Sequence, residues 1–324
     1  MKVTIIGAGA IGSLFAARLA HSGCDVALLV RDSASLPTHG NLIQLSDETG
    51  NRSIAVGFES DPTILGAQGL VILAVKAHSI AGTLQQIKPL LDAETIILTA
   101  VNGLPWWWFE GHQSAPPASA LMSIDADGAI SNALGHQPLV GCVLFPAAHL
   151  VAPGIVRHLS GNRIVFGNPR PRDNQALAVA NLFAAAGFET PVSPDVRSAL
   201  WAKLVGNATV NPLSVITGAT IKHIAEDPDL SAILTSAMAE IDNVGSSIGI
   251  APMMTQPERL TLAASVGHHK TSMLQDFEAG RPLELAPLLG AVREIAEWKG
   301  VSTPVLDTFH HLIAAKLSAP ASTA

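Results

Sequence analysis

The sequence begins MKVTIIGAGAIGSLFAARLA (residues 1–20), and these residues carry the strongest indication of the fold class. The apolar run Val3–Ile6 predicts a strand, glycines follow at positions 7, 9 and 12, and a helical pattern continues from there. Gly7 permits a tight turn, Gly9 lets the backbone approach a pyrophosphate, and Gly12 allows helix and strand to pack closely. Free N–H groups at the helix start favour an anion. The predicted dinucleotide-binding residues are Gly7, Gly9, Ala10, Ile11 and Gly12.

Two other interpretations of this stretch compete. A Gly-x-Gly-x-x-Gly pattern arises by chance in glycine-rich turns, but here it lies between a predicted strand and a predicted helix, as a dinucleotide site requires. A secretory signal peptide would begin with a charge such as Lys2 and continue as an unbroken apolar segment. Glycines interrupt that segment and Arg18 lies inside its helix, so we do not favour a signal peptide.

The composition indicates a globular protein of two domains. The chain has 324 residues, 48% of them hydrophobic, and a formal net charge of −7, which provides no basic field for nucleic acid or an anionic membrane. Cys24 and Cys142 are far apart and lack nearby metal ligands, so we expect no metal, no disulfide framework and a cytoplasmic location. Residues 128–156 carry no Asp, Glu, Lys or Arg, but prolines interrupt them, which predicts short buried strands.

The second predicted strand bears on the choice of cofactor. Val26–Val30 completes a βαβ unit and ends at Arg31. In such units a carboxylate near this point bonds the ribose 2′-hydroxyl of NADH, whereas an arginine accommodates the 2′-phosphate of NADPH. Arg31 therefore favours NADPH, although Asp32 beside it keeps NADH open; a solvated arginine at a strand end is the plainer alternative.

Two later strands end in polar residues. Gly69–Val75 and Thr95–Ala100 have the continuous apolar character of buried parallel strands, and Lys76 and Asn102 follow them. Ligands of open α/β sheets lie outside the carboxyl ends of the strands, so Lys76 and Asn102 are expected to face cofactor and substrate. A solvated lysine and an Asn-Gly turn are the alternatives.

The fold class follows from the order of elements. Residues 41–58 predict short antiparallel strands, Leu139–Phe166 the last strands of the first domain, and Gly167–Arg172 a linker. Helical periodicity then appears at residues 174–186, 195–216, 228–248, 257–267, 287–299 and 303–317. We predict an α/β protein with a Rossmann-type dinucleotide-binding domain at residues 1–170 and an all-α C-terminal domain at residues 171–324, of which residues 318–324 form a frayed tail.

An aromatic loop and a polar row remain to be placed. Leu104–Phe109 contains three consecutive tryptophans, which form either a lid over a pocket or a plug packed against the second domain or another subunit. In WAKLVGNATVNPL (residues 201–213), Lys203, Asn207 and Asn211 recur every four residues and share one helix face. Because the same helix is largely apolar, this row faces either a polar cleft or, as an ordinary exposed stripe, solvent.

Motifs in matching order make the chain resemble the ketopantoate reductase family (2-dehydropantoate 2-reductases) over nearly its whole length. They are GAGAIG at residues 7–12, Arg31, AVKA around Lys76, Asn102-Gly103, the helix of Lys203, Asn207 and Asn211, and TSMLQD at residues 271–276 followed by Glu284. The glycine pattern is common to many dehydrogenases, whereas the Lys-x-x-x-Asn-x-x-x-Asn and Ser-Met-Leu-Gln-Asp motifs together are far more specific.

The resemblance implies an oxidoreductase of pantothenate and coenzyme A biosynthesis that reduces 2-dehydropantoate to (R)-pantoate with NADPH. It implies that Lys203 is the general acid and Glu284 the carboxylate that orients the substrate, the two catalytic residues. A lysine suits this chemistry, because hydride transfer to a ketone leaves negative charge on its oxygen. The implied substrate-binding residues are Lys76, Asn102, Asn207, Asn211 and Ser272, and Lys76, Asn102 and Arg31 join the glycine turn as cofactor-binding residues.

Two departures from the family pattern leave the substrate open. The family follows its glutamate with Asp two positions on and Asn three further, whereas this chain has Ala286 and Leu289. Another bulky 2-keto acid is therefore an alternative substrate, and a non-catalytic NADP(H)-binding sensor is an alternative of another class. The expected partner is a small 2-keto acid, without nucleic acid or membrane, and a homodimer is one assembly that the sequence allows.

Overall fold

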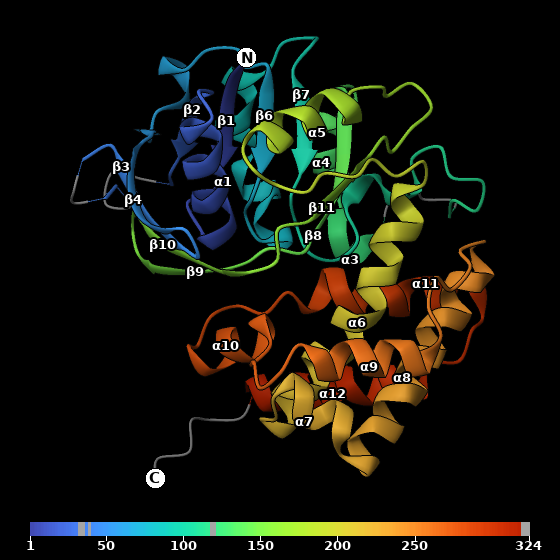
Figure 1. Cartoon of the computed structure of the whole chain (residues 1–324). Helices are drawn as coiled ribbons and strands as arrows, with labels where there is room; N and C mark the ends of the chain where they lie inside the picture. Colours follow the sequence, from blue (N-terminus) through green and yellow to red (C-terminus); the bar gives the residue numbers. More distant parts are fainter. Residues whose placement is uncertain (32–35, 38–39, 117–120, 319–324) are drawn as a thin grey trace. The chain divides into compact units, whose positions relative to one another are not determined.

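The computed structural model describes residues 1–31, 36–37, 40–116 and 121–318 (Figure 1). The chain forms two compact units, and each is built from two separate stretches of sequence. Unit 1 comprises Met1–Val101 and Gly128–Arg197, and unit 2 comprises Asn102–Asp127 and Ser198–Ala324. The chain therefore leaves the first unit, contributes a short segment to the second and returns before it enters the second unit again.

Unit 1 is built on a seven-stranded sheet with the order β11-β8-β7-β6-β1-β2-β5. All neighbouring strands are parallel except β11 and β8, which are antiparallel. The order runs outward in opposite directions from β1 and β6, so the turn after β1 lies where ligands bind in open α/β sheets. The strands are β1 (Lys2–Ile6), β2 (Asp25–Leu29), β5 (Gly57–Glu59), β6 (Leu70–Leu73), β7 (Ile96–Thr99), β8 (Leu139–Leu144) and β11 (Ile164–Gly167).

A second sheet of unit 1 has the order β4-β3-β10-β9. β3 (Leu42–Asp47) and β4 (Gly50–Ala55) form the antiparallel pair predicted for residues 41–58, and β9 (Ala147–Ala152) pairs antiparallel with β10 (Ile155–Ser160). Arg18 of α1 (Ala10–His21) lies 3.1 Å from His158 Nδ1 of β10 and 3.6 Å from Asp47 of β3. These contacts fix the small sheet beside α1.

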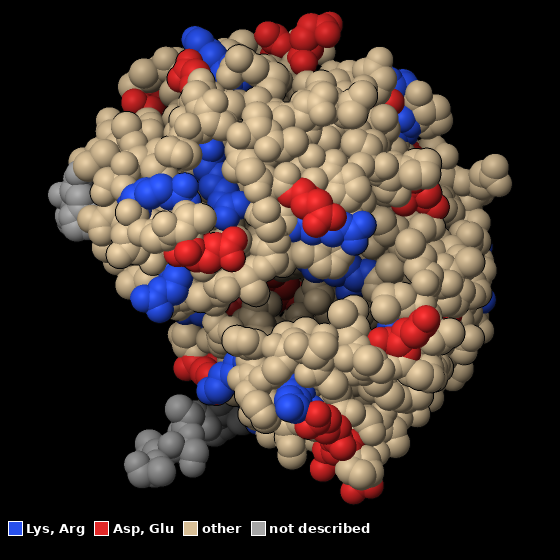
Figure 2. Space-filling model, viewed as in Figure 1, with Lys and Arg blue, Asp and Glu red and all other residues tan. Residues whose placement is uncertain are grey.

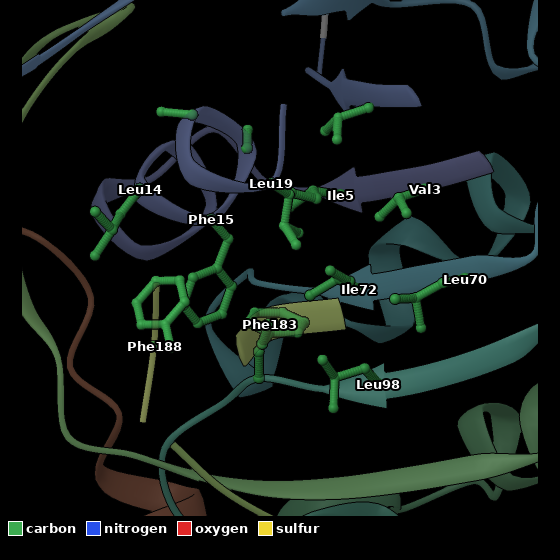
Figure 3. Packing of buried hydrophobic residues seen from close by; sticks show 14 of the residues in the cluster. Val3, Ile5, Leu14, Phe15, Leu19, Leu70, Ile72, Leu98, Phe183 and Phe188 are labelled. Carbon is green, nitrogen blue, oxygen red and sulfur yellow. The ribbon is translucent and has the colours of Figure 1, made fainter. Parts of the chain in front are cut away.

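The core of unit 1 joins α1 to a helix from beyond the predicted linker (Figure 3). Phe15 of α1 contacts Phe183 of α5 (Ala176–Ala185) edge to face at a centroid distance of 5.0 Å, and it contacts Phe188 in the same way at 5.5 Å. Both phenylalanines belong to the cluster that contains Ile5 and Ile72 of the sheet. The predicted domain boundary near residue 170 and the compact units therefore divide the chain differently, because α5 buries its apolar face on the sheet.

The shorter elements of unit 1 connect these strands. They are the α-helices α2 (Leu84–Ile87) and α4 (Ala129–Leu134) and the 3-10 turns η2 (Pro62–Ile64), η3 (Ala77–Ser79), η4 (Ala81–Thr83) and η5 (Lys88–Leu90).

Unit 2 is helical, with no strand among its described residues. The C-terminal region is helical as predicted, and the predicted helices occur within a few residues of their expected ends, although the one at 174–186 belongs to unit 1 and residues 287–299 are divided between η7 and α11. The helices α3, α7 and α10 were not predicted. The helices are α3 (Met122–Asp125), α6 (Val196–Thr217), α7 (Ile221–Glu226), α8 (Pro228–Ser247), α9 (Gln256–Ser265), α10 (Ser272–Glu278), α11 (Ala291–Lys299) and α12 (Pro304–Ser318), with a 3-10 turn η6 (Trp106–Phe109) and a π-helix η7 (Ala286–Gly290).

The aromatic loop is a plug within unit 2. All four side chains of Trp106–Phe109 are buried. The rings of Trp108 and Trp201 lie 5.7 Å apart, and Phe109 contacts Trp298 edge to face at 5.8 Å. Of the two hypotheses for this loop, packing against the helical region is the one observed.

The face drawn in Figure 2 carries positive and negative side chains interspersed over a largely uncharged surface. In the described part of the chain, no helix combines the length and apolar character needed to cross a membrane.

Candidate active site

The glycine turn after β1 has two positions that exclude any side chain. Gly7 has φ +109°, and a Cβ built on it would lie 2.7 Å from Val75 Cγ1. A Cβ on Gly12 would lie only 2.0 Å from the Gly7 carbonyl oxygen. These clearances match the predicted roles of Gly7 in the turn and of Gly12 in the packing of α1 against the strand.

Gly9 differs from its two neighbours in the motif because its surroundings are open. It is the N-cap of α1 with an ordinary φ of −75°, and a Cβ built on it would meet no described heavy atom within 4 Å. Ala10 and Ile11 form the first turn, which has no acidic residue, and no described side chain caps it. An open backbone cradle at the positive end of a helix fits a dinucleotide pyrophosphate.

Arg31 lies at the same edge of the sheet as the glycine turn. β1 and β2 are parallel with Ile6 opposite Leu29, so Arg31 follows the end of β2 as the turn follows the end of β1. Its side chain is exposed, and its carbonyl oxygen accepts a hydrogen bond from Gln86 Nε2 at 3.5 Å. Asp32, the residue that kept NADH open, lies outside the described residues.

Lys76 and Asn102 each follow the end of a strand by three residues. Lys76 comes after β6 and Asn102 after β7, and these parallel strands pair with Leu73 opposite Thr99. Lys76 is half-buried at the N-terminus of η3. Asn102 is half-buried and begins the segment that unit 2 takes from the first half of the chain.

The polar row of α6 is not an exposed stripe. Lys203 and Asn207 are half-buried, and Asn211 is only 8% exposed. Lys203 Nζ donates a hydrogen bond to Asn102 Oδ1 at 3.0 Å. The structure therefore brings together two predicted site residues that are far apart in the sequence.

The helix that carries Lys203 contacts α8 and α9 through residues that the sequence analysis did not identify. The indole of Trp201 packs so closely on α8 that a Cβ on Gly245 would lie 2.5 Å from its Nε1. Arg259 donates to Asp242 Oδ1 (3.1 Å) and to the carbonyl oxygen of Ala202 (3.5 Å). Burial raises the pKa of the Asp242 carboxyl above its usual value, and the nearby Arg259 guanidinium opposes this.

Ser272 begins α10 next to the end of the polar row. Its neighbour Thr271 caps the helix by accepting the N–H of Leu274, and the Thr271 hydroxyl lies 2.6 Å from Ser214 Oγ. Ser214 in turn donates to the carbonyl oxygen of Asn211 at 2.7 Å. This chain of hydroxyls ties the start of α10 to α6. A threonine directly before an apolar helical pattern is a capping signal that sequence reasoning could have used.

Glu284 is half-buried and directly precedes the Leu285 that leads into η7. Two residues at which the chain departs from the family pattern lie inside this π-helix. Ala286 is exposed, and Leu289 is fully buried among apolar residues. Neither side chain can donate or accept a hydrogen bond to a substrate.

The described residues contain no group of three or more His, Cys, Asp or Glu side chains that could hold a metal ion. The sheet topology and the glycine turn after β1 place unit 1 in the Rossmann class, whose typical ligands are dinucleotides.

Comparisons with known proteins identify the family. The model described as ketopantoate reductase PanE/ApbA matches residues 3–171, and the one described as its C terminal matches residues 195–317. A 2-dehydropantoate 2-reductase of Mesorhizobium japonicum is 38% identical over 315 residues, 97% of each chain. The chain belongs to the ketopantoate reductase family, as its motifs predict, and is an oxidoreductase; members of this family and structural neighbours bind a nicotinamide dinucleotide.

Solved structures share the whole fold. A crystal structure from Ralstonia solanacearum MolK2 has a TM-score of 0.89 and 35% identity over 97% of both chains. The 2-dehydropantoate 2-reductase of Geobacter metallireducens GS-15 has a TM-score of 0.85 and 26% identity, covering 98% of this chain and all of that one (100%).

The open cradle at Gly9 leads to a testable expectation. Gly9→Ala should weaken dinucleotide affinity about tenfold or more, because the added methyl group occupies the space that the backbone needs to approach a pyrophosphate. Titration of the purified protein with NADPH, followed by tryptophan fluorescence, measures the effect. Gly82→Ala is the control, since Gly82 is also open and lies in η4. Equal affinities of the two variants would remove Gly9 from the cofactor site.

Proposed function

We propose that the protein reduces 2-dehydropantoate to (R)-pantoate with NADPH, as a step of pantothenate and coenzyme A biosynthesis. The observation that carries this proposal is the hydrogen bond from Lys203 Nζ to Asn102 Oδ1 on a half-buried polar helix face. Gly7, Gly9 and Gly12 belong to unit 1, and both partners of this hydrogen bond belong to unit 2.

Lys203 acts as the general acid in this proposal. Bound NADPH supplies the hydride that reduces the C2 ketone. As negative charge develops on the ketone oxygen, the Lys203 ammonium stabilises it and transfers a proton to it, which yields the alcohol and leaves a neutral amine that solvent reprotonates. An ammonium has three N–H donors, and the one directed at Asn102 fixes the orientation of the group.

The other candidate residues bind and orient the substrate. Asn207 and Asn211 extend the polar row beyond Lys203, and their amides can donate to a carboxylate and accept from a hydroxyl. Ser272 offers a hydroxyl at the start of α10, and Glu284 offers a carboxylate that accepts hydrogen bonds from substrate hydroxyls. Lys76 and Asn102 contact both cofactor and substrate in this proposal.

A second substrate class has an observation in its favour. The exposed Ala286 and buried Leu289 replace the polar residues expected after Glu284, so this part of unit 2 is more apolar than the family pattern. Another bulky 2-keto acid is therefore the alternative substrate. A cytoplasmic location and a homodimer stay predictions.

Steady-state rates over a panel of 2-keto acids, each with NADPH and with NADH, test the proposal. We expect the highest kcat/KM for 2-dehydropantoate with NADPH. A higher value for a different bulky 2-keto acid would replace the substrate and keep the reaction type. NADPH binding without turnover of any member of the panel would establish a sensor and refute the enzyme.

Replacement of Lys203 tests its role as the acid. Lys203→Ala should lower kcat by about two to four orders of magnitude, since general acid catalysis contributes on that scale. Single-turnover rates of cofactor oxidation measure this, and NADPH binding should persist. Lys222→Ala, which removes a lysine that pairs with Glu226 on the surface of α7, is the control. Turnover equal to that of the control would exclude Lys203 as the acid.

Arg31 tests the choice of cofactor. Arg31→Ala should weaken NADPH binding about tenfold to a hundredfold, because a hydrogen bond to a charged phosphate is worth about 1.5–3 kcal/mol, and should leave NADH binding nearly unchanged. Isothermal titration with both cofactors makes the comparison, with the exposed Arg157 of β10 replaced by alanine as the control. An equal loss for NADH and NADPH would remove the 2′-phosphate from the argument.

A further inference from the structure

We infer that the close contact between Gly103 and the π-helix at Pro287 is a positioning device. It fixes the position of the Asn102 amide and, through the hydrogen bond to that amide, the position of the Lys203 ammonium. Asn102 accepts the hydrogen bond of Lys203 Nζ, and Gly103 is the next residue in the chain. The catalytic consequence rests on the proposed function, whereas the contact itself belongs to the structure of unit 2.

Gly103 meets the backbone of η7 so closely that no side chain fits. A Cβ built on Gly103 would lie 2.4 Å from the Pro287 carbonyl oxygen and 2.6 Å from its carbonyl carbon. The next residue, Leu104, donates its N–H to the same oxygen at 2.9 Å. Gly103 also has φ +85°, a conformation that favours glycine. Both a conformational and a steric constraint therefore act at this residue.

The π-helix explains why the Pro287 carbonyl is available for this contact. In an α-helix the N–H of Ala291 would bond to the carbonyl four residues earlier, that of Pro287. Here the N–H of Ala291 bonds to the carbonyl of Ala286, five residues earlier. The Pro287 oxygen accepts the Leu104 N–H instead. The extra residue of η7 thus converts a helical carbonyl into an anchor for a distant segment.

This anchor connects three parts of the candidate site. Glu284 precedes Pro287 by three residues, Asn102 precedes Gly103 by one, and Lys203 binds Asn102 from α6. A shift of the Gly103 backbone relative to η7 would therefore change the position of the Asn102 amide relative to the Lys203 ammonium and to Glu284.

The segment that contains Gly103, Asn102–Asp127, also contacts α11, which directly follows η7, near its other end. Glu294 accepts the N–H groups of Met122 and Ser123 at 2.6 and 2.9 Å and the Ser123 hydroxyl at 2.7 Å. The contacts at Gly103 and at Glu294 therefore connect the segment to η7 and to α11 at two separate places.

Gly103→Ala tests the device. Its Cβ must move from 2.4 Å to at least 3.0 Å from the Pro287 oxygen, so the two backbones must separate. We expect kcat to fall about tenfold to a hundredfold, the scale on which small misplacements of catalytic groups act. Gly249→Ala is the matched control, because Gly249 has φ +87° but no described atom within 4 Å of a built Cβ. Equal kcat values for the two variants would overturn the inference.

A double-mutant comparison separates positioning from general damage. If Gly103 acts through Asn102, Gly103→Ala should change kcat by less than about threefold when Asn102 is already alanine, because coupled residues are not additive. The same fold loss with and without Asn102 would show that Gly103 acts elsewhere. Deletion of Ala286, which returns the Ala291 N–H to Pro287, is the second variant should Gly103→Ala not fold; kcat equal to that of wild type would contradict the inference.

A readout that does not depend on turnover keeps the two proposals apart. In protein labelled with 13C-lysine, the Lys203 Cε resonance should move in Gly103→Ala and in Asn102→Ala but not in Gly249→Ala. If no 2-keto acid is turned over yet the resonance moves in this pattern, the proposed function fails and the positioning device stands. An unmoved resonance in Gly103→Ala refutes the device whatever the enzyme reduces.

Discussion

The hydrogen bond between Lys203 Nζ and Asn102 Oδ1 is the interaction on which the candidate site depends. A half-buried ammonium needs a partner, because removing a charge from water without compensation is costly. Asn102 provides this partner. It begins a segment that follows β7 in the sequence but belongs to the helical unit, so this unit is built from two separate stretches of the chain. The bond directs one N–H of the ammonium at the Asn102 amide.

Both units position functional groups through glycines that bring two backbones together. In unit 1 the Gly12 position approaches the Gly7 carbonyl, which sets the start of α1 against the end of β1. In unit 2 the Gly103 position approaches the Pro287 carbonyl, which sets Asn102 beside η7. A backbone contact is a stiffer constraint than a side-chain contact, because no rotamer change can relieve it. In each unit, a close backbone contact at a glycine thus positions the groups that the proposed reaction uses.

Sequence reasoning recovered what local patterns encode. The parallel strands, the glycine turn and the helical C-terminal region follow from apolar periodicity and turn chemistry, and the polar row of Lys203, Asn207 and Asn211 follows from helical spacing. It could not recover contacts between distant segments. The pairing of Gly103 with Pro287 and the packing of Phe183 on Phe15 have no local signature, since each depends on where two remote elements meet. The burial of the polar row also has no local signature in the sequence, because it depends on what packs against α6.

The π-helix η7 bears on both the position of Asn102 and the choice of substrate. It supplies the carbonyl that anchors Gly103, and it also contains Ala286 and Leu289, the two departures from the family pattern. Leu289 is fully buried, so its apolar side chain stabilises the element that holds Asn102 and contributes no polar group to a substrate. A polar residue at that buried position would need a partner to offset its desolvation. The apolar character of η7 therefore supports the proposed positioning of Asn102 and Lys203, and it leaves the side chains of Ala286 and Leu289 without polar groups that could discriminate between substrates.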